Sequence, residues 1–229
     1  TAADAVTWLT RASDKGRGDA MRALAEIYLK GKGVAPDITK GQAWLIKATN
    51  YGDDKAMGRL GDIYFEKDPK KALSWYEKAA EAGDVNAAYT AAIMYAENYN
   101  IKPDAKKAAA LLKQAATAGH PAAQADYGLM VYQGNGVAKS VDDAAKWFQK
   151  SAIGGDPEGQ FLYAFTLAKG EGVTQSYEDA YYWLLRAEQN ANTAKIDEYD
   201  QTRAELKTRL EANVAPSILD KARKRVGSK

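Results

Sequence analysis

Few side chains in this sequence have the type and spacing that catalysis or metal binding requires. The chain contains one histidine, His120, and no cysteine. His120 directly precedes Pro121 and has no acidic or nucleophilic residue at a fixed spacing, so we interpret it as a residue at the start of a helix rather than a general base. A zinc site needs several cysteine or histidine ligands. We therefore predict that the protein uses no metal and no cofactor.

Two acidic pairs, Asp142–Asp143 and Glu178–Asp179, have the composition that general acid–base chemistry needs. Each pair falls in the first turn of a predicted helix, where carboxylates bind free backbone N–H groups and favour the positive end of the helix dipole. This placement favours a structural role. The segment 134–140 is similar to a phosphate-binding loop, but Ala138 replaces the glycine that should precede the lysine. We do not expect nucleotide binding.

A basic cluster lies at 221–225, in the sequence Lys-Ala-Arg-Lys-Arg. The last turn of a helix favours such residues, and no aromatic residue is interleaved for stacking on bases. The whole chain carries a net charge of +2, whereas nucleic-acid binding needs a concentrated basic face. No apolar run approaches the roughly 20 residues of a membrane span. We expect neither nucleic acid as a partner nor a transmembrane segment.

Tryptophan and glycine recur along the chain with one common period. Successive tryptophans lie 36, 31, 72 and 36 residues apart, and Leu111 occupies the position that the long interval skips. A glycine series has spacings of 36, 31, 36 and 36, so the two markers share one shortened interval. A fixed period of this size indicates stacked supersecondary units. The markers are Trp8, Trp44, Trp75, Trp147 and Trp183, and Gly16, Gly52, Gly83, Gly119 and Gly155.

Each period predicts two helices joined by a glycine turn. In the first complete unit, Leu24 and Tyr28 lie on one face of a helix that ends near Lys30. A second helix extends from Asp37 to about Asn50. The turn glycines recur in later units and become asparagines in the third, which indicates a backbone with positive φ. The turn pairs are Gly31/Gly33, Asn98/Asn100, Gly134/Gly136 and Gly170/Gly172.

Small residues recur at two positions of every first helix, where larger side chains would overpack the contact between the helices. The tryptophans share one position of the second helix, and we expect Trp44 and Trp75 to be buried there. The small positions are Ala20, Ala56, Ala87, Ala123 and Gly159, and Ala25, Gly61, Ala92, Gly128 and Ala164.

The combination of glycine turn, tryptophan and period resembles the Sel1-like repeat family, which is related to tetratricopeptide repeats. Residues 24–34 carry the first half of the family pattern and residues 71–83 the second half. The resemblance implies an all-α protein, a right-handed α/α superhelix (solenoid) of helical hairpins. A half unit and five repeats would occupy 1–190, and C-terminal capping helices 191–229. The family tyrosine is absent at Val131 and Leu167, and the family tryptophan at Leu111.

Two capping helices are predicted from apolar residues at helical spacing. They contain Ile196, Tyr199, Leu206 and Leu210, and then Ile218, Ala222 and Val226.

If the hairpins stack like tetratricopeptide units, the first helices line a concave side, and their outward-facing residues change from charged to apolar along the chain. Exposed aromatic residues in a row mark recognition surfaces. The alternative is that the apolar residues pack against the next unit or the terminal helix. The predicted contacts with a partner are Tyr89, Ile93, Leu129, Tyr132, Phe161 and Phe165, with Arg22, Glu26, Lys55 and Asp62 at the charged end.

The resemblance implies a bacterial scaffold or adaptor without enzymatic activity. We expect a monomer that binds another protein on the concave face, although fold alone does not select the partner. One alternative is an immunity protein that neutralises a secreted bacterial toxin. The alternative of another class is a hydrolase with an unrecognised site. We place the protein in the bacterial periplasm or cell envelope, with the cytoplasm as the alternative.

Overall fold

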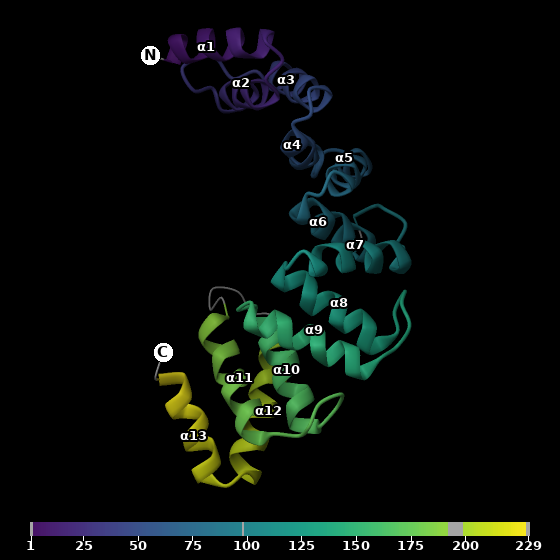
Figure 1. The fold of residues 1–229 in the computed structure, drawn as a ribbon, viewed down its shortest axis with the longest axis vertical. Coiled ribbons are helices and arrows are strands. Elements are labelled where there is room, and N and C mark those ends of the chain that lie inside the picture. The colour runs from purple at the N-terminus through teal and green to yellow at the C-terminus, as the bar shows by residue number, and fades with distance from the viewer. Residues whose placement is uncertain (1, 98, 192–198, 228–229) are drawn as a thin grey trace. The chain divides into compact units, whose positions relative to one another are not determined.

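α-Helices make up all regular secondary structure in the computed structural model, which describes residues 2–97, 99–191 and 199–227 (Figure 1). The helices are α1 (Ala2–Asp14), α2 (Gly18–Lys30), α3 (Ile38–Asn50), α4 (Asp54–Tyr64), α5 (Pro69–Glu81), α6 (Val85–Ala96), α7 (Ala105–Thr117), α8 (Pro121–Gln133), α9 (Val141–Ile153), α10 (Pro157–Lys169), α11 (Tyr177–Asn190), α12 (Asp200–Asn213) and α13 (Pro216–Gly227).

The chain divides into two compact units, Thr1–Pro103 and Asp104–Lys229. Within each unit most helices pack against the next helix along the chain, as α2 does on α3 and α8 on α9. This arrangement confirms the all-α class of stacked helical hairpins. The boundary at residue 190 between repeats and cap stays a prediction. Both expected terminal helices are present as α12 and α13, and Ile196 lies outside the described residues.

Neighbouring hairpins share one core in the N-terminal unit. A single apolar cluster joins Met21 of α2, Leu45 of α3 and Leu60 of α4, all with no exposed surface. A pair of helices this short buries too little apolar surface to fold alone, so each hairpin depends on the next.

The marker glycines end the second helices in left-handed backbone. Their φ angles lie between 79° and 97° at Gly16, Gly52, Gly83, Gly119 and Gly155. In the turn within the third hairpin, Asn100 has a φ of 59°, the one positive value at a non-glycine residue among those described. The expected substitution of asparagine for a turn glycine is thus confirmed at this position, whereas Asn98 lies outside the described residues.

The two helices of a hairpin fit each other by size. Gly61 of α4 faces Tyr76 of α5, and a Cβ added at Gly61 would lie 2.5 Å from the tyrosine ring. Gly128 of α8 faces Phe148 of α9, and an added Cβ would lie 2.8 Å from that ring. Both glycines are therefore required because an aromatic side chain fills the space of the missing methyl group.

The other three hairpins carry the opposite combination at the same repeat positions. Alanine replaces the glycine, and leucine replaces the aromatic residue. All six side chains are buried. The combined volume of the two side chains at this contact is thus nearly constant, although each of the two side chains varies between hairpins. The pairs of repeat positions are Ala25 with Leu45, Ala92 with Leu112 and Ala164 with Leu184.

This size matching predicts strong coupling between Gly128 and Phe148. We expect Gly128→Ala to destabilise the protein by about 1–3 kcal/mol, because overpacking outweighs the higher helix propensity of alanine. In a Phe148→Leu background the same change should be neutral or stabilising. Urea unfolding of the two single variants and the double variant measures the coupling.

Gly58 provides the matched control, since it lies inside α4 and its added Cβ would meet only a carboxylate oxygen of Asp84, at 3.3 Å. Gly58→Ala should stabilise by up to about 1 kcal/mol. The size-matching interpretation would be contradicted if Gly128→Ala changed the free energy of unfolding equally in the unaltered chain and in the Phe148→Leu background.

The tryptophans are not buried as the shared position led us to expect. Trp44 and Trp75 are half-buried, and Trp8 is 66% exposed. Because consecutive helical residues point about 100° apart, the residue after each tryptophan position faces the core instead. Those buried residues are Leu45, Tyr76, Leu112, Phe148 and Leu184.

A lysine one turn later covers each of three tryptophan rings. The Nζ atoms of Lys47, Lys78 and Lys150 lie 4.9, 4.5 and 4.1 Å from the ring centroids of Trp44, Trp75 and Trp147. Such cation–π contacts at partly exposed sites contribute about 0.5–1 kcal/mol each. In the hairpin where leucine replaces tryptophan, the residue at the lysine position is Gln114. The tryptophan and the lysine therefore function as a pair on the rim of the hairpin.

This rim position predicts that Trp44→Ala destabilises less than Leu45→Ala. We expect about 1–2 kcal/mol for the half-buried tryptophan and about 3–4 kcal/mol for the fully buried leucine. Thermal or urea unfolding of both variants tests the order. A larger loss for Trp44→Ala would place the indole, not the leucine, in the core.

Candidate functional site

An apolar cavity of about 200 Å³ opens between α8, α10 and α12 of the C-terminal unit. Helical spacing creates it, because Leu129 and Tyr132 lie one turn apart on α8, and Phe161 and Phe165 one turn apart on α10. These four residues belong to the predicted partner contacts. No charged side chain lines the cavity. Its lining residues are Leu129, Tyr132, Phe148, Phe161, Leu162, Phe165, Thr166, Tyr199 and Thr202.

Phe161 forms the inner wall of this cavity and is only 2% exposed. Its ring centroid lies 5.4 Å from that of Tyr199 and 6.4 Å from that of Phe165. Phe161 therefore does not face outward as a partner contact, because Tyr199 at the start of α12 covers its ring; for this residue the alternative of packing within the chain holds. Leu129, Tyr132 and Phe165 are half-buried and remain accessible.

Polar groups define the rim of the cavity. The Tyr132 hydroxyl donates a hydrogen bond of 2.6 Å to Glu171, in the turn that follows α10. This bond lowers the pKa of Glu171 and raises that of Tyr132, so the carboxylate stays charged. Lys169 places its Nζ 4.2 Å from the centroid of the Phe165 ring and 3.4 Å from Glu171. An apolar cavity with such a rim has the composition of a binding site for an apolar side chain.

Tyr89 and Ile93 lie one turn apart on α6, in the N-terminal unit. Both are half-buried, as expected for residues at the edge of a helix face. Their role in partner contact stays a prediction.

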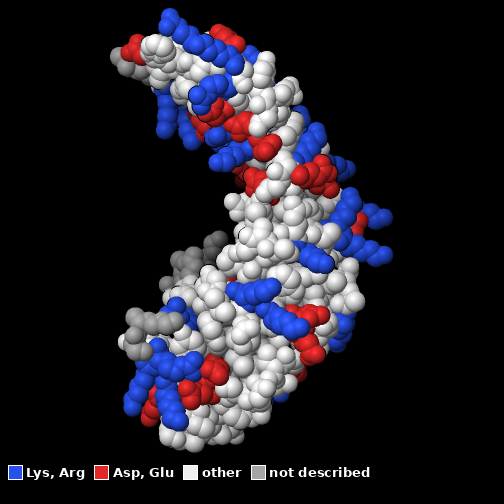
Figure 2. All heavy atoms as spheres, viewed as in Figure 1, with Lys and Arg blue, Asp and Glu red and all other residues white. Residues whose placement is uncertain are grey.

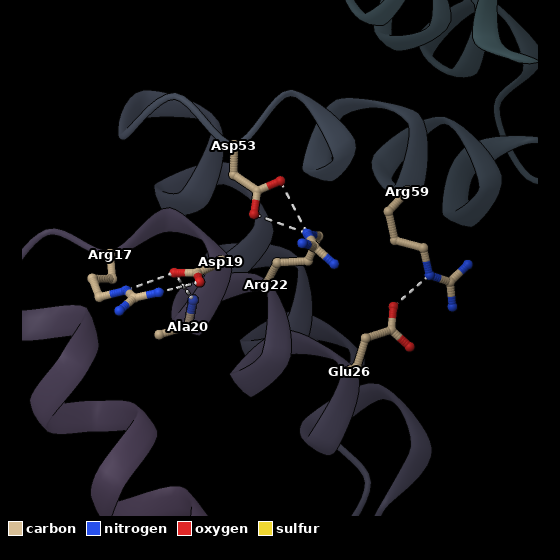
Figure 3. A network of polar contacts seen from close by, with 7 residues as sticks. All are labelled: Arg17, Asp19, Ala20, Arg22, Glu26, Asp53 and Arg59. Atoms are coloured by element: carbon tan, nitrogen blue, oxygen red, sulfur yellow. Dashed lines mark hydrogen bonds and ion pairs between the residues drawn. The ribbon is translucent and has the colours of Figure 1, made fainter. Parts of the chain in front are cut away.

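Two of the predicted charged residues, Arg22 and Glu26, form ion pairs that join α2 to α4 and its N-cap (Figure 3). Arg22 of α2 donates from Nε to both carboxylate oxygens of Asp53, at 3.0 and 2.9 Å. Glu26 accepts from Arg59 of α4 at 2.6 Å. These bonds connect α2 to the start and middle of α4.

Two further contacts extend this network of ion pairs. Asp62 pairs with Arg59 at 3.3 Å and accepts from the Tyr76 hydroxyl at 2.9 Å. Burial and this bond to Asp62 raise the pKa of Tyr76. Burial opposes the charge of Glu26, but bonds from Lys30 and Arg59 outweigh it and lower the pKa of that carboxyl group.

Acidic and basic side chains are consequently interspersed on the visible face of the N-terminal unit (Figure 2). Of the four predicted charged contacts, Arg22, Glu26 and Asp62 have ion-pair partners, and Lys55 is exposed beside a shallow depression. Asp53 was not among the residues predicted from the sequence. Its position after a marker glycine indicates a helix N-cap, yet its side chain makes no cap bond and pairs with Arg22 instead.

The residues considered for catalysis have structural partners. The Nδ1 atom of His120 accepts from the backbone N–H of Ala123, which caps α8. Asp143 pairs with Ser140 and Lys146 at the start of α9. Within the described residues, no group of three or more metal-ligating side chains comes together.

Arginines of the basic cluster at 221–225 join α13 to α11 through ion pairs and ring contacts. Arg225 contacts Glu178 at 3.0 Å and Asp179 at 2.8 Å, and its guanidinium lies over the Tyr182 ring. Arg223 donates to the Tyr181 hydroxyl at 3.0 Å. Both acidic pairs of the sequence thus serve helix starts and ion pairs. In the described part of the chain, no helix is long and apolar enough to cross a membrane.

Comparison with known families matches the Sel1 repeat at five consecutive segments, 18–53, 54–84, 85–120, 121–156 and 157–192. Each segment begins at a first helix, and the first four segments end one residue after a marker glycine. The chain therefore belongs to the Sel1 repeat family, as the sequence pattern predicts. Sel1 repeat proteins generally mediate protein–protein interactions, and the fold is typically a scaffold without enzymatic activity.

Three solved structures illustrate the likeness. A Sel1 repeat protein from Oxalobacter formigenes is 27% identical, with 96% of this chain and 90% of that chain covered and a TM-score of 0.78. The protective antigen c5321 of uropathogenic Escherichia coli is 25% identical over 96% and 58%, with a TM-score of 0.46. The immunity protein PA5088 of Pseudomonas aeruginosa is 20% identical over 86% and 82%, with a TM-score of 0.44. The search of curated proteins gave no match.

The ion pair between Arg22 and Asp53 predicts a structural role for Arg22. The Asp53 side chain is only 7% exposed, so removing its partner leaves a buried charge. We expect Arg22→Ala to destabilise by about 1–3 kcal/mol in urea unfolding. The double variant with Asp53→Ala should recover part of that loss.

Lys55→Ala is the control, because Lys55 is exposed and should change stability by less than about 0.5 kcal/mol. Equal stability of the Arg22→Ala and Lys55→Ala variants would show that the pair contributes nothing to the fold.

Proposed function

We propose that the protein is a non-enzymatic scaffold that binds a segment of a partner protein and holds one apolar side chain of that segment in the cavity between α8, α10 and α12. The observation that carries this proposal is the convergence of four predicted contacts on one apolar cavity. Leu129 and Tyr132 come from one repeat, and Phe161 and Phe165 from the next.

The size and lining of the cavity support this function. A volume of about 200 Å³ accommodates one large aliphatic or aromatic side chain, whose burial would contribute about 1.5–3 kcal/mol. Phe161 is already packed in the isolated chain and needs no rearrangement on binding. A preformed wall of this kind reduces the entropy cost of association.

The ion-paired residues of the N-terminal unit have a different role in this proposal. Arg22, Glu26 and Asp62 already have partners within the chain, so they would gain little energy from new contacts. They would position a partner segment that reaches them, together with Lys55. Neutralisation of a toxin, the alternative form of this function, would use the same cavity.

The cavity is tested with Leu129→Asp, which places a charge on its half-buried wall, and Phe165→Ala, which removes part of its lining. We expect both variants to retain less than about one tenth of the partner protein that the unaltered chain retains from extracts of its source organism, measured by quantitative mass spectrometry. The loss follows because the partner's apolar side chain no longer has a complementary surface.

Ile153→Asp is the matched control, because Ile153 is 70% exposed at the end of α9 and lies outside the cavity. Circular dichroism and melting temperature establish that each variant is folded. If both folded cavity variants retain the same proteins in the same amounts as Ile153→Asp, the cavity is not the binding site.

A further inference from the structure

A second cavity, of about 330 Å³, lies directly beside the apolar cavity, and Phe165 lines both. Its floor is apolar, because Leu206, Leu210 and Val214 are buried there. Its walls carry polar groups that the first cavity lacks. The lining residues are Phe165, Ala168, Lys169, Tyr177, Leu206, Arg209, Leu210, Asn213 and Val214.

The two cavities form one groove between α10 and α12. On α12, Thr202 lines the first cavity and Arg209 the second. Seven residues of helix separate them, which corresponds to about 10 Å at 1.5 Å per residue. On α10 the same order holds, from Phe161 to Lys169. An extended peptide covers about 10 Å with three residues, so one short segment reaches both cavities.

Charge distinguishes the second cavity. Lys169 and Arg209 are its charged lining residues, and no carboxylate lines it. Lys169 lies over the Phe165 ring at the boundary between the cavities, with Glu171 as an acceptor at 3.4 Å. Arg209 is exposed on α12, and no ion pair of its side chain occurs among the described residues. A guanidinium in this position can bind a carboxylate through two parallel hydrogen bonds.

We infer that the partner segment is extended and acidic, with a large apolar side chain in the first cavity and, three residues later, an aspartate or glutamate side chain that pairs with Arg209 and Lys169. This inference rests on the proposed function and specifies its partner chemically. The apolar contact supplies most of the affinity, and the carboxylate fixes the direction in which the segment lies along the groove.

The test is a selection of random 12-residue peptides displayed with their C-terminus fused, so that no free terminal carboxylate is present. Selection on the full chain should enrich an apolar residue followed at the third position by Asp or Glu. One enriched sequence is then synthesised with acetylated and amidated ends. Its Glu-to-Gln form should bind about five-fold more weakly at low salt, and the difference should shrink as the salt concentration rises.

A charge-reversed chain, Lys169→Glu with Arg209→Glu, should no longer enrich the acidic position and should favour Lys or Arg there. Its matched control is Lys221→Glu with Lys224→Glu, which changes the net charge equally on exposed residues of α13 and should enrich the same peptides as the unaltered chain.

The outcomes separate this inference from the proposed function. Peptides that depend on Leu129 but show no acidic preference would overturn the inference and leave the apolar cavity as the site. The same would follow if synthetic peptides bound only with a free C-terminal carboxylate. Peptides that bind equally to the Leu129→Asp chain, or no enrichment at all, would contradict both proposals.

Discussion

The fold depends on one contact, the close approach of the two helices within each hairpin. Where the first helix of a hairpin carries alanine, the second helix places a leucine at this contact. Where the first helix carries glycine, the second helix places an aromatic ring there. In the hairpin of α8 and α9, Gly128 leaves room for Phe148, and α10 and α11 carry Ala164 and Leu184 at the same positions. Interiors packed to crystal-like density tolerate such exchange only when volume is conserved. This spacing sets how α8 packs on α9 and α10 on α11, the two hairpins that carry most of the cavity lining.

The apolar cavity is a consequence of how the repeats end. The last matched Sel1 repeat ends at residue 192 and contains α10 and α11. Residues of α12 and its N-cap line the apolar cavity together with residues of α8 and α10. Tyr199 covers Phe161, while Leu129, Tyr132 and Phe165 stay accessible. α12 thereby forms a wall opposite α10 in both cavities.

The sequence predicted the period, the hairpins and the turn backbone, since these depend on local chemistry such as positive φ at Asn100. It placed Leu129, Tyr132 and Phe165 on outward-facing positions, and the structure brings them to one cavity that was not itself predicted. It did not predict that Trp44 lies on the rim, because a repeat position gives no absolute rotation of the helix. It missed the pairing of Arg22 with Asp53 and the cover over Phe161, because both contacts join residues that only the packed structure brings together.

The size matching also has a consequence for how such a chain can change over evolutionary time. Both residues of each matched contact lie within one hairpin. A gene segment that encodes a whole hairpin therefore carries both residues of that contact, and duplication or recombination between hairpins keeps the two matched. An exchange in the turn between the two helices would join Gly128 to a leucine or Ala164 to a phenylalanine, giving a void or a clash. Because each hairpin also shares its core with its neighbour, the number of repeats changes by whole hairpins, whose two helices are inherited as a pair.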